Sequence, residues 1–139
     1  MKLPRHVRRR NREPFRAARY RLARTERKDS TELLEIAASE SGGVRLVRLT
    51  GELDMAGVDR FERLLTADQR SDAETFVIDL RGLTFIDSSG LRALIMADQH
   101  VRAEGGRFVV VRGPERVNEV LEMTGVAQRI ELVDEPPGR

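Results

Sequence analysis

The sequence contains no cysteine and no tryptophan, and aromatic residues make up only 4% of its 139 residues. Without cysteine, the chain has neither disulfide bridges nor thiolate ligands for a metal ion. Its apolar runs fall far short of the roughly 20 residues that span a bilayer, and it shows no secretory signal pattern. We therefore expect one cytoplasmic domain without a transmembrane segment, because a chain of this length supports a single core.

Histidine and lysine are also scarce, which limits the catalytic chemistry that the chain can perform. His100 follows Ser88 by 12 residues on one predicted helix, about 18 Å along its axis, and His6 lies far away near the N-terminus, so no histidine can activate that serine. Lys2 and Lys28 are the only lysines, and no Gly-Lys-Ser/Thr phosphate loop is present. We expect no enzymatic activity, no catalytic residue and no cofactor.

Asp79 is the residue that most resembles a phosphate acceptor of the aspartyl-phosphate receiver type, because it lies at the predicted end of a strand. That chemistry resembles a pattern that needs a lysine from a later strand, and residues 31–139 contain none. The other carboxylates are scattered along predicted helix faces, where solvated charge is their usual role. We therefore disfavour a receiver and predict no metal site.

Charge divides the chain into two parts. Residues 1–30 carry 12 Lys+Arg against 3 Asp+Glu, a net charge of +9, whereas residues 31–139 carry 13 against 20, a net charge of −7. The first part has too little apolar content to offset the entropy of folding. We expect a disordered Arg-rich extension at 1–30, a folded domain at 31–135 and a flexible tail at 136–139.

The basic extension also permits a second interpretation. Phe15, Ala18 and Leu22 fall on one face of a short basic helix, which would make weak contact with nucleic acid or an anionic membrane. The folded domain itself is not expected to bind DNA directly.

Apolar periodicity predicts an alternation of strands and helices after residue 31. Strands are predicted at 33–37, 44–50, 75–80, 83–86, 107–111 and 130–133, with turns at 41–43 and 81–82. Helices are predicted at 54–67, at 88–102 and from Pro114 to just before Gly125. This order predicts an α/β fold in which a mixed central sheet of about five strands is crossed by three helices.

The first predicted helix has an apolar stripe, and Asp54 is placed to cap its N-terminus. The apolar positions of this stripe recur every three or four residues and are Met55, Val58, Phe61, Leu64 and Leu65.

One local feature stands out, because an apolar strand delivers the run Asp87, Ser88, Ser89 and Gly90 to the start of the second helix. The structural interpretation is capping, since Asp87 or Ser88 can accept hydrogen bonds from the free N–H groups of the first turn and stabilise the helix by about 1 kcal/mol. The functional interpretation is phosphorylation of an exposed serine, which adds about two negative charges to any interface that covers this turn.

Two segments together resemble the STAS domain family of the anti-sigma factor antagonist (anti-anti-sigma factor) type. They are Thr50-Gly51-Glu52-Leu53-Asp54 and the run from Leu83 to Leu91, spaced as the strand and helix order of that family requires. The resemblance covers about residues 32–134 and implies a STAS-type fold. The pair of motifs is far more specific than either motif alone.

The resemblance implies a partner switch in bacterial transcription regulation, in the setting of stress response or sporulation. Unphosphorylated protein would bind an anti-sigma factor that is a GHKL-type serine kinase and so free the sigma factor. Phosphorylation of Ser88 by that kinase would release the complex, and a PP2C-type phosphatase would reset it. Asp54, Asp87, Ser89 and Gly90 would form the partner-binding surface near the switch.

A different class of function stays open, namely a STAS adaptor that packs constitutively in a lipid-transport or anion-transport complex without any phosphoryl transfer. The sequence also departs from the family pattern, because residues 131–139 leave no room for a further C-terminal helix. That departure predicts an exposed apolar face or a shifted partner surface.

Overall fold

The computed structural model describes residues 33–66 and 73–137. Some predictions lie outside the described residues. They are the disordered extension at 1–30, the alternative basic helix within it, and the last two residues of the predicted tail.

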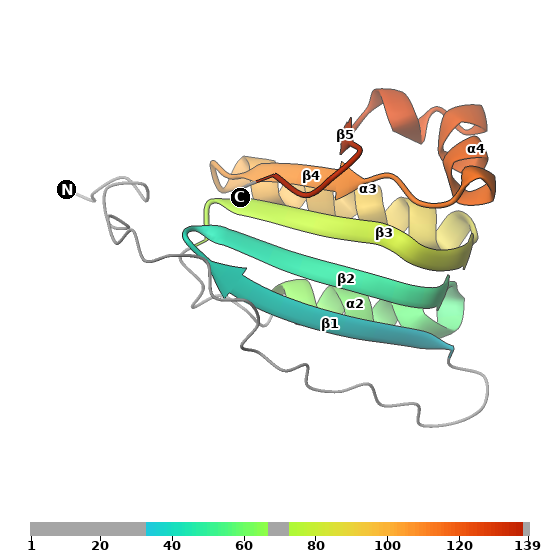
Figure 1. The fold of residues 1–139 in the computed structure, drawn as a ribbon, viewed down its shortest axis with the longest axis horizontal. Coiled ribbons are helices and arrows are strands. Elements are labelled where there is room, and N and C mark those ends of the chain that lie inside the picture. Colours follow the sequence, from blue (N-terminus) through green and yellow to red (C-terminus); the bar gives the residue numbers. More distant parts are fainter. Residues whose placement is uncertain (1–32, 67–72, 138–139) are drawn as a thin grey trace.

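A five-stranded sheet in the order β1-β2-β3-β4-β5 forms the centre of the fold (Figure 1). β1 pairs with β2 in the antiparallel sense, and every other neighbouring pair is parallel. This is the predicted mixed α/β sheet. The strands are β1 (Leu34–Ser41), β2 (Val44–Leu53), β3 (Thr75–Ile86), β4 (Arg107–Val111) and β5 (Glu131–Val133).

Among the described residues, three helices and one short 3₁₀ turn connect the strands. α2 and α3 lie side by side behind the sheet as it is seen in Figure 1, and α4 contacts β3. Their bounds are α2 (Met55–Thr66), α3 (Ser88–Ala103), α4 (Glu115–Met123) and η1 (Val126–Gln128). The three predicted helices are confirmed within one residue at most ends, whereas the 3₁₀ turn is not apparent in the periodicity.

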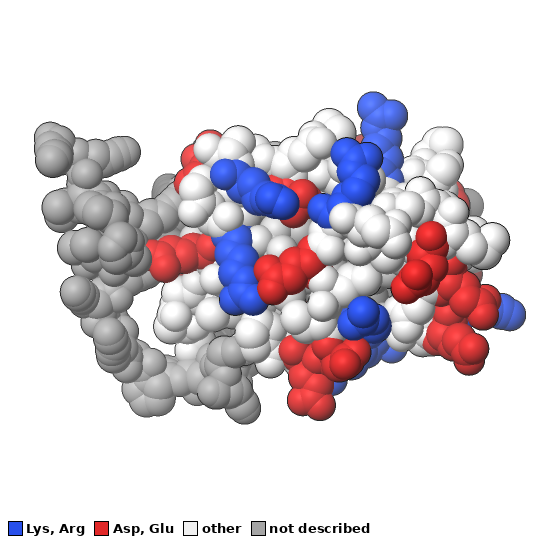
Figure 2. Space-filling model, turned by 90° about the horizontal axis from the view of Figure 1, so that it is seen from above, with Lys and Arg blue, Asp and Glu red and all other residues white. Residues whose placement is uncertain are grey.

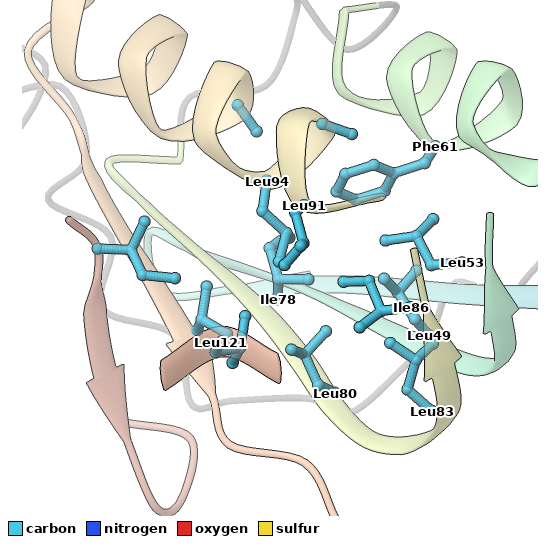
Figure 3. Packing of buried hydrophobic residues seen from close by; sticks show 14 of the residues in the cluster. Leu49, Leu53, Phe61, Ile78, Leu80, Leu83, Ile86, Leu91, Leu94 and Leu121 are labelled. Carbon is cyan, nitrogen blue, oxygen red and sulfur yellow. The ribbon is translucent and has the colours of Figure 1, made fainter. Parts of the chain in front are cut away.

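The main core fills the space between the sheet and the two long helices. Phe61 of α2 and Leu94 of α3 are fully buried, and Figure 3 shows Leu94 beside Ile78 of β3 and Phe61 beside Leu53 of β2. Burying side chains of this size contributes about 1.5–3 kcal/mol each. The core therefore fixes α3, and with it the Asp-Ser-Ser-Gly run, against the central strands.

The predicted turn at Arg81 and Gly82 is wrong, because β3 runs through both residues without a break. Arg48 pairs with Asp79 and Thr50 with Gly82, so Leu49 of β2 stands opposite two residues of β3. This arrangement is a β-bulge, which bends a strand without ending it. Glycine next to arginine indicated a local irregularity, but only the neighbouring strand decides between a bulge and a turn.

Met55 differs from the other members of the apolar stripe in α2. It is 71% exposed, although the stripe alone would favour its burial. The helix begins at Met55, so this residue lies in the first turn, at the sheet edge, where the core no longer covers it. Residues 134–137 form no helix, and Asp134 instead pairs with Arg112 at 3.2 Å.

Candidate functional site at the start of α3

The pairing of β2 with β3 brings the two singled-out segments together at one edge of the sheet. Leu53 and Ile86 are the last register partners of these parallel strands. Neighbouring strands lie about 4.8 Å apart, so Asp54 and Asp87, which follow them directly, leave the sheet side by side. Asp87 N–H also donates to the Leu53 carbonyl at 3.3 Å, which ties the two chain segments to each other.

Asp87 is the residue that caps α3. Its Oδ1 accepts hydrogen bonds from Ser89 N at 2.9 Å and Gly90 N at 3.1 Å, and its backbone is extended, as an N-cap requires. Of the two predicted caps, the structure thus selects Asp87. Ser88 is the first residue of the helix, its side chain is exposed, and its hydroxyl makes no hydrogen bond within the described residues.

Gly90 is buried and allows α3 to approach the end of β2 closely. A Cβ at this position would lie 2.5 Å from the Leu53 carbonyl oxygen and 2.8 Å from Ile86 Cγ1. A backbone carbonyl cannot move aside as a flexible side chain does, so any larger residue would displace the helix start. Gly90 therefore acts on the exposed turn by positioning Ser88 and Ser89 rather than by presenting a side chain.

Asp54 performs the corresponding task for α2. Its Oδ1 accepts hydrogen bonds from Ala56 N at 3.1 Å and Gly57 N at 3.3 Å, which confirms the predicted N-cap. Asp54 is nevertheless only half-buried, and the pairing of Leu53 with Ile86 brings it next to Asp87 at the start of α3. Its expected part in partner binding stays a prediction.

Gly51, in the segment from Thr50 to Asp54, is required by close backbone packing. Gly51 has a φ of 103°, which side-chain-bearing residues rarely adopt, and a Cβ there would overlap the Leu33 carbonyl. That carbonyl accepts a hydrogen bond from Glu52 N at 3.0 Å. The chain that leads into β1 is thereby attached to the same sheet edge.

Exposed apolar side chains lie around this edge. Glu52 is the register partner of Phe85, and Leu33 lies on the other side of Glu52. Phe85 is 47% exposed and Leu33 44% exposed, and Met55 follows the Asp54 cap directly. We call Leu33, Met55 and Phe85 the rim residues. Sequence reasoning missed this set, because its members come from three chain segments.

Asp79 is a buried carboxylate on β3, away from this edge. Arg81 donates to it from Nε, Nη2 and its backbone N, each at 3.0 Å, and Arg48 Nε donates at 3.2 Å. Burial raises the pKa of Asp79, but the hydrogen bonds from Arg81 and Arg48 outweigh it, so the pKa lies below its ordinary value.

The predicted strand-end position of Asp79 is therefore wrong. The residue lies inside β3, is 0% exposed and is fully engaged by two arginines. A phosphate donor does not reach such a carboxylate, so the geometry of Asp79 also disfavours a receiver.

Two cavities lie near the C-terminal half of α3 and share Asp98 and Arg102. Their volumes are about 490 and 220 Å³. Ser88, Asp54 and Asp87 line neither of them.

Within residues 33–66 and 73–137, no group of three or more His, Asp or Glu side chains could hold a metal ion. None of the helices there combines the length and apolar character needed to cross a membrane.

Figure 2 shows basic and acidic side chains interspersed among uncharged ones on the face seen from above. Exposed ion pairs also occur in the described residues, such as Arg107 with Glu131, where a hydrogen bond from Arg107 lowers the pKa of Glu131. Binding to nucleic acid uses a continuous basic surface. The face in Figure 2 is not of that kind.

Comparison with known proteins identifies the family. The STAS domain model matches residues 35–136. An anti-sigma F factor antagonist of Paenibacillus polymyxa is 32% identical over 102 residues, which cover 73% of this chain and 87% of that protein. The structure of an anti-sigma factor antagonist from Mycobacterium paratuberculosis has a TM-score of 0.65 at 25% identity and covers 73% of this chain and 86% of its own.

The phosphorylated form of the Bacillus cell fate determinant SpoIIAA shares the fold. Its TM-score is 0.57 at 22% identity, over 72% of this chain and 92% of that chain. The resemblance drawn from the two sequence segments is thus confirmed, and the chain belongs to the STAS domain family.

Proposed function

We propose that this protein is an anti-sigma factor antagonist that switches its partner by phosphorylation of Ser88. In the unphosphorylated form it binds an anti-sigma factor of the GHKL serine kinase type and frees the sigma factor. The exposed Ser88 hydroxyl, without a hydrogen bond in the described part of the chain, is the observation that carries the proposal. The name of the Paenibacillus polymyxa relative supports the same class of partner.

The chemistry takes place in the partner. The γ-phosphoryl group of ATP passes to Ser88 Oγ as the bond to the β-phosphate oxygen breaks, the hydroxyl proton leaves to a base of the kinase, and ADP departs. A PP2C-type phosphatase then hydrolyses the phosphoserine with water. We infer no catalytic group in this chain.

Phosphorylation at this position leaves the fold intact. Ser88 contributes no hydrogen bond that the modification would break, and Asp87 keeps the N–H groups of Ser89 and Gly90 satisfied. Ser88 is exposed, so the added group stays accessible to water in the free protein. The switch therefore acts on binding and leaves folding unchanged.

Release of the partner follows from charge burial. A phosphoserine carries about −1.5 to −2 charges at neutral pH, and it would stand beside the carboxylates of Asp87 and Asp54. An interface that covers the turn must remove water from all three groups, and each 1.4 kcal/mol of this cost weakens binding tenfold. The rim residues would supply the apolar contact that holds the unphosphorylated complex together.

The test uses serine kinases of the GHKL type from the source genome with ATP and the full chain. Peptide mass spectrometry is expected to place phosphate on Ser88, and Ser88→Ala is expected to abolish the modification. Ser89→Ala, which removes the neighbouring hydroxyl, is the matched control and is expected to carry the phosphate on Ser88 still, because the site of modification does not depend on Ser89 even where its loss slows the reaction. Phosphate on another residue, or none with any kinase, contradicts the proposal.

Binding measurements separate the switch from the constitutive adaptor. The switch predicts that Ser88→Ala binds the kinase permanently and that Ser88→Asp binds it weakly. An adaptor in a lipid-transport or anion-transport complex would be indifferent to both substitutions and would copurify with its transport partner.

The contribution of residues 1–30 is tested separately. Weak contact with nucleic acid or a membrane through their arginines would fall steeply with salt and vanish on deletion of the segment. The same proposal includes a cytoplasmic location, where the sigma factor would be released. Whether the protein acts in sporulation or in stress response depends on which sigma factor that is.

A further inference from the structure

Arg92 lies one helical turn after Ser88 on α3, and its side chain is exposed. Side chains four residues apart face each other on a helix, with about 5–6 Å between their Cβ atoms. Helical side chains also lean towards the N-terminus, so that of Arg92 leans towards Ser88. The guanidinium makes no hydrogen bond or ion pair within the described residues. Residues 88, 89, 95 and 96, at the positions where a helical partner would lie, are all uncharged.

The same helix shows what this spacing does when an acid is present. Asp98 and Arg102 are also four residues apart, and Arg102 Nε donates to Asp98 Oδ1 at 3.2 Å. The acid precedes the base, which is the more favourable order on a helix. Phosphorylation of Ser88 would create the same order and spacing, with a phosphate group in place of the carboxylate.

We propose that Arg92 is the phosphate-binding residue of the modified protein and pairs with phosphoserine 88 across one turn of α3. The backbone N–H groups of Ser89 and Gly90 already donate to Asp87, so they do not compete for the phosphate. Arginine offers two parallel donors to a phosphate group, which suits this task. The pair holds the phosphate along the helix and neutralises part of its charge.

This inference rests on the proposed function for its biological use, but its test needs no kinase. Phosphoserine is incorporated at position 88 of the full chain during translation, and the phosphate is titrated by ³¹P NMR. We expect the pKa of the phosphate to be about 0.3 pH units lower with Arg92 than in Arg92→Gln, from the size of such helical pairs. The conservative variant Arg92→Lys should keep most of the difference, and 1 M salt should reduce it.

Other charges near the phosphate are constant in this comparison. Asp87 on the same turn and Asp54 at the start of α2 both raise the pKa of the phosphate, equally in the parent and in the variant. Arg102→Gln serves as the matched control. Arg102 lies about 21 Å further along the helix than Ser88, so this substitution should leave the phosphate titration unchanged. The Nε–H resonance of Arg92 should also move on phosphorylation.

Equal phosphate pKa values with and without Arg92, or an unmoved Nε–H resonance, overturn the inference. Failure of every kinase to modify Ser88 would instead overturn the proposed function and leave the titration result standing. The two ideas can therefore fail separately.

Discussion

Leu53 of β2 and Ile86 of β3 are the last register partners of the central parallel strands, and they bring Asp54 and Asp87 to the same sheet edge. Each aspartate caps the helix that follows it. Two helix starts therefore lie next to each other, one of which carries an exposed serine. The proposed switch would use this edge, because the two caps hold the backbone in place next to the exposed serine.

Asp87 is the cap of α3, and the proposed phosphorylation site is the neighbouring Ser88, so stability measurements can test whether Ser88 also caps the helix. Asp87→Ala removes the acceptor of two backbone N–H groups and is expected to lower the free energy of unfolding by about 1 kcal/mol. Ser88→Ala removes no hydrogen bond and should stay within about 0.5 kcal/mol of the parent. Urea denaturation of both variants gives the answer. A loss for Ser88→Ala as large as that for Asp87→Ala would show that Ser88 also caps.

Gly90 is expected to tolerate no side chain. Gly90→Ala places a Cβ 2.5 Å from the Leu53 carbonyl oxygen, and we expect a loss of about 1–3 kcal/mol in the free energy of unfolding. Gly57→Ala in α2 is the matched control, because its Cβ would meet only side-chain atoms of Leu34, Cδ2 at 3.0 Å and Cβ at 3.1 Å, at least 0.5 Å farther than the Leu53 carbonyl oxygen is at Gly90. That variant should remain within about 1 kcal/mol of the parent, helped by the higher helix propensity of alanine. Equal losses in the two variants would contradict the packing argument.

Asp79 should stabilise the protein in a pH-dependent way. Removing one member of a buried ion pair costs about 3 kcal/mol, so Asp79→Asn should be less stable than the parent by roughly that amount at pH 7. The pKa of Asp79 is lowered in the folded state, so its contribution is complete above the ordinary value of 3.8. It is lost as the pH falls from there through the folded-state pKa.

Urea denaturation at pH 7, 5 and 3 measures this dependence. The difference in the free energy of unfolding between Asp79→Asn and the parent should become smaller only at pH 3. Glu131→Gln is the control, since the pair of Glu131 with Arg107 is exposed and should contribute less than about 1 kcal/mol. A constant difference for Asp79→Asn at all three values would exclude the ionised carboxylate as its cause.

Phe85 is expected to be an anchor of the partner interface. Phe85→Ser removes a large exposed ring from the rim residues and should weaken binding of the kinase-type anti-sigma factor at least tenfold, about 1.4 kcal/mol. Met96 is similarly exposed, at 49%, but lies about 12 Å further along α3 than Ser88. Calorimetry should show a much smaller loss of affinity for the anti-sigma factor with Met96→Ser than with Phe85→Ser. Similar losses of affinity for both variants would place the interface elsewhere.

Local patterns were sufficient to predict the order of strands and helices. Alternation and three-to-four spacing are imposed on each segment by the face that it buries, so β4 and α3 are readable from their own residues. The Asp-Ser-Ser-Gly run and the cap at Asp54 were likewise local. These features could be assigned without knowledge of any neighbouring segment.

Other features depend on contacts between segments that are distant in the sequence. Whether Arg81 and Gly82 turn or bulge is decided by Leu49 on the next strand. The exposure of Met55 is decided by where the core stops, because its place in the apolar stripe alone would bury it.

The sequence by itself determined the family, the α/β order and the serine at a helix start, because each is encoded in residues close together in the chain. Only the tertiary structure decided that Asp87 rather than Ser88 is the cap, and that Leu33 and Phe85 share one edge. The physical reason is that hydrogen-bond geometry and strand register are set by long-range packing. A pattern along one segment does not contain that information.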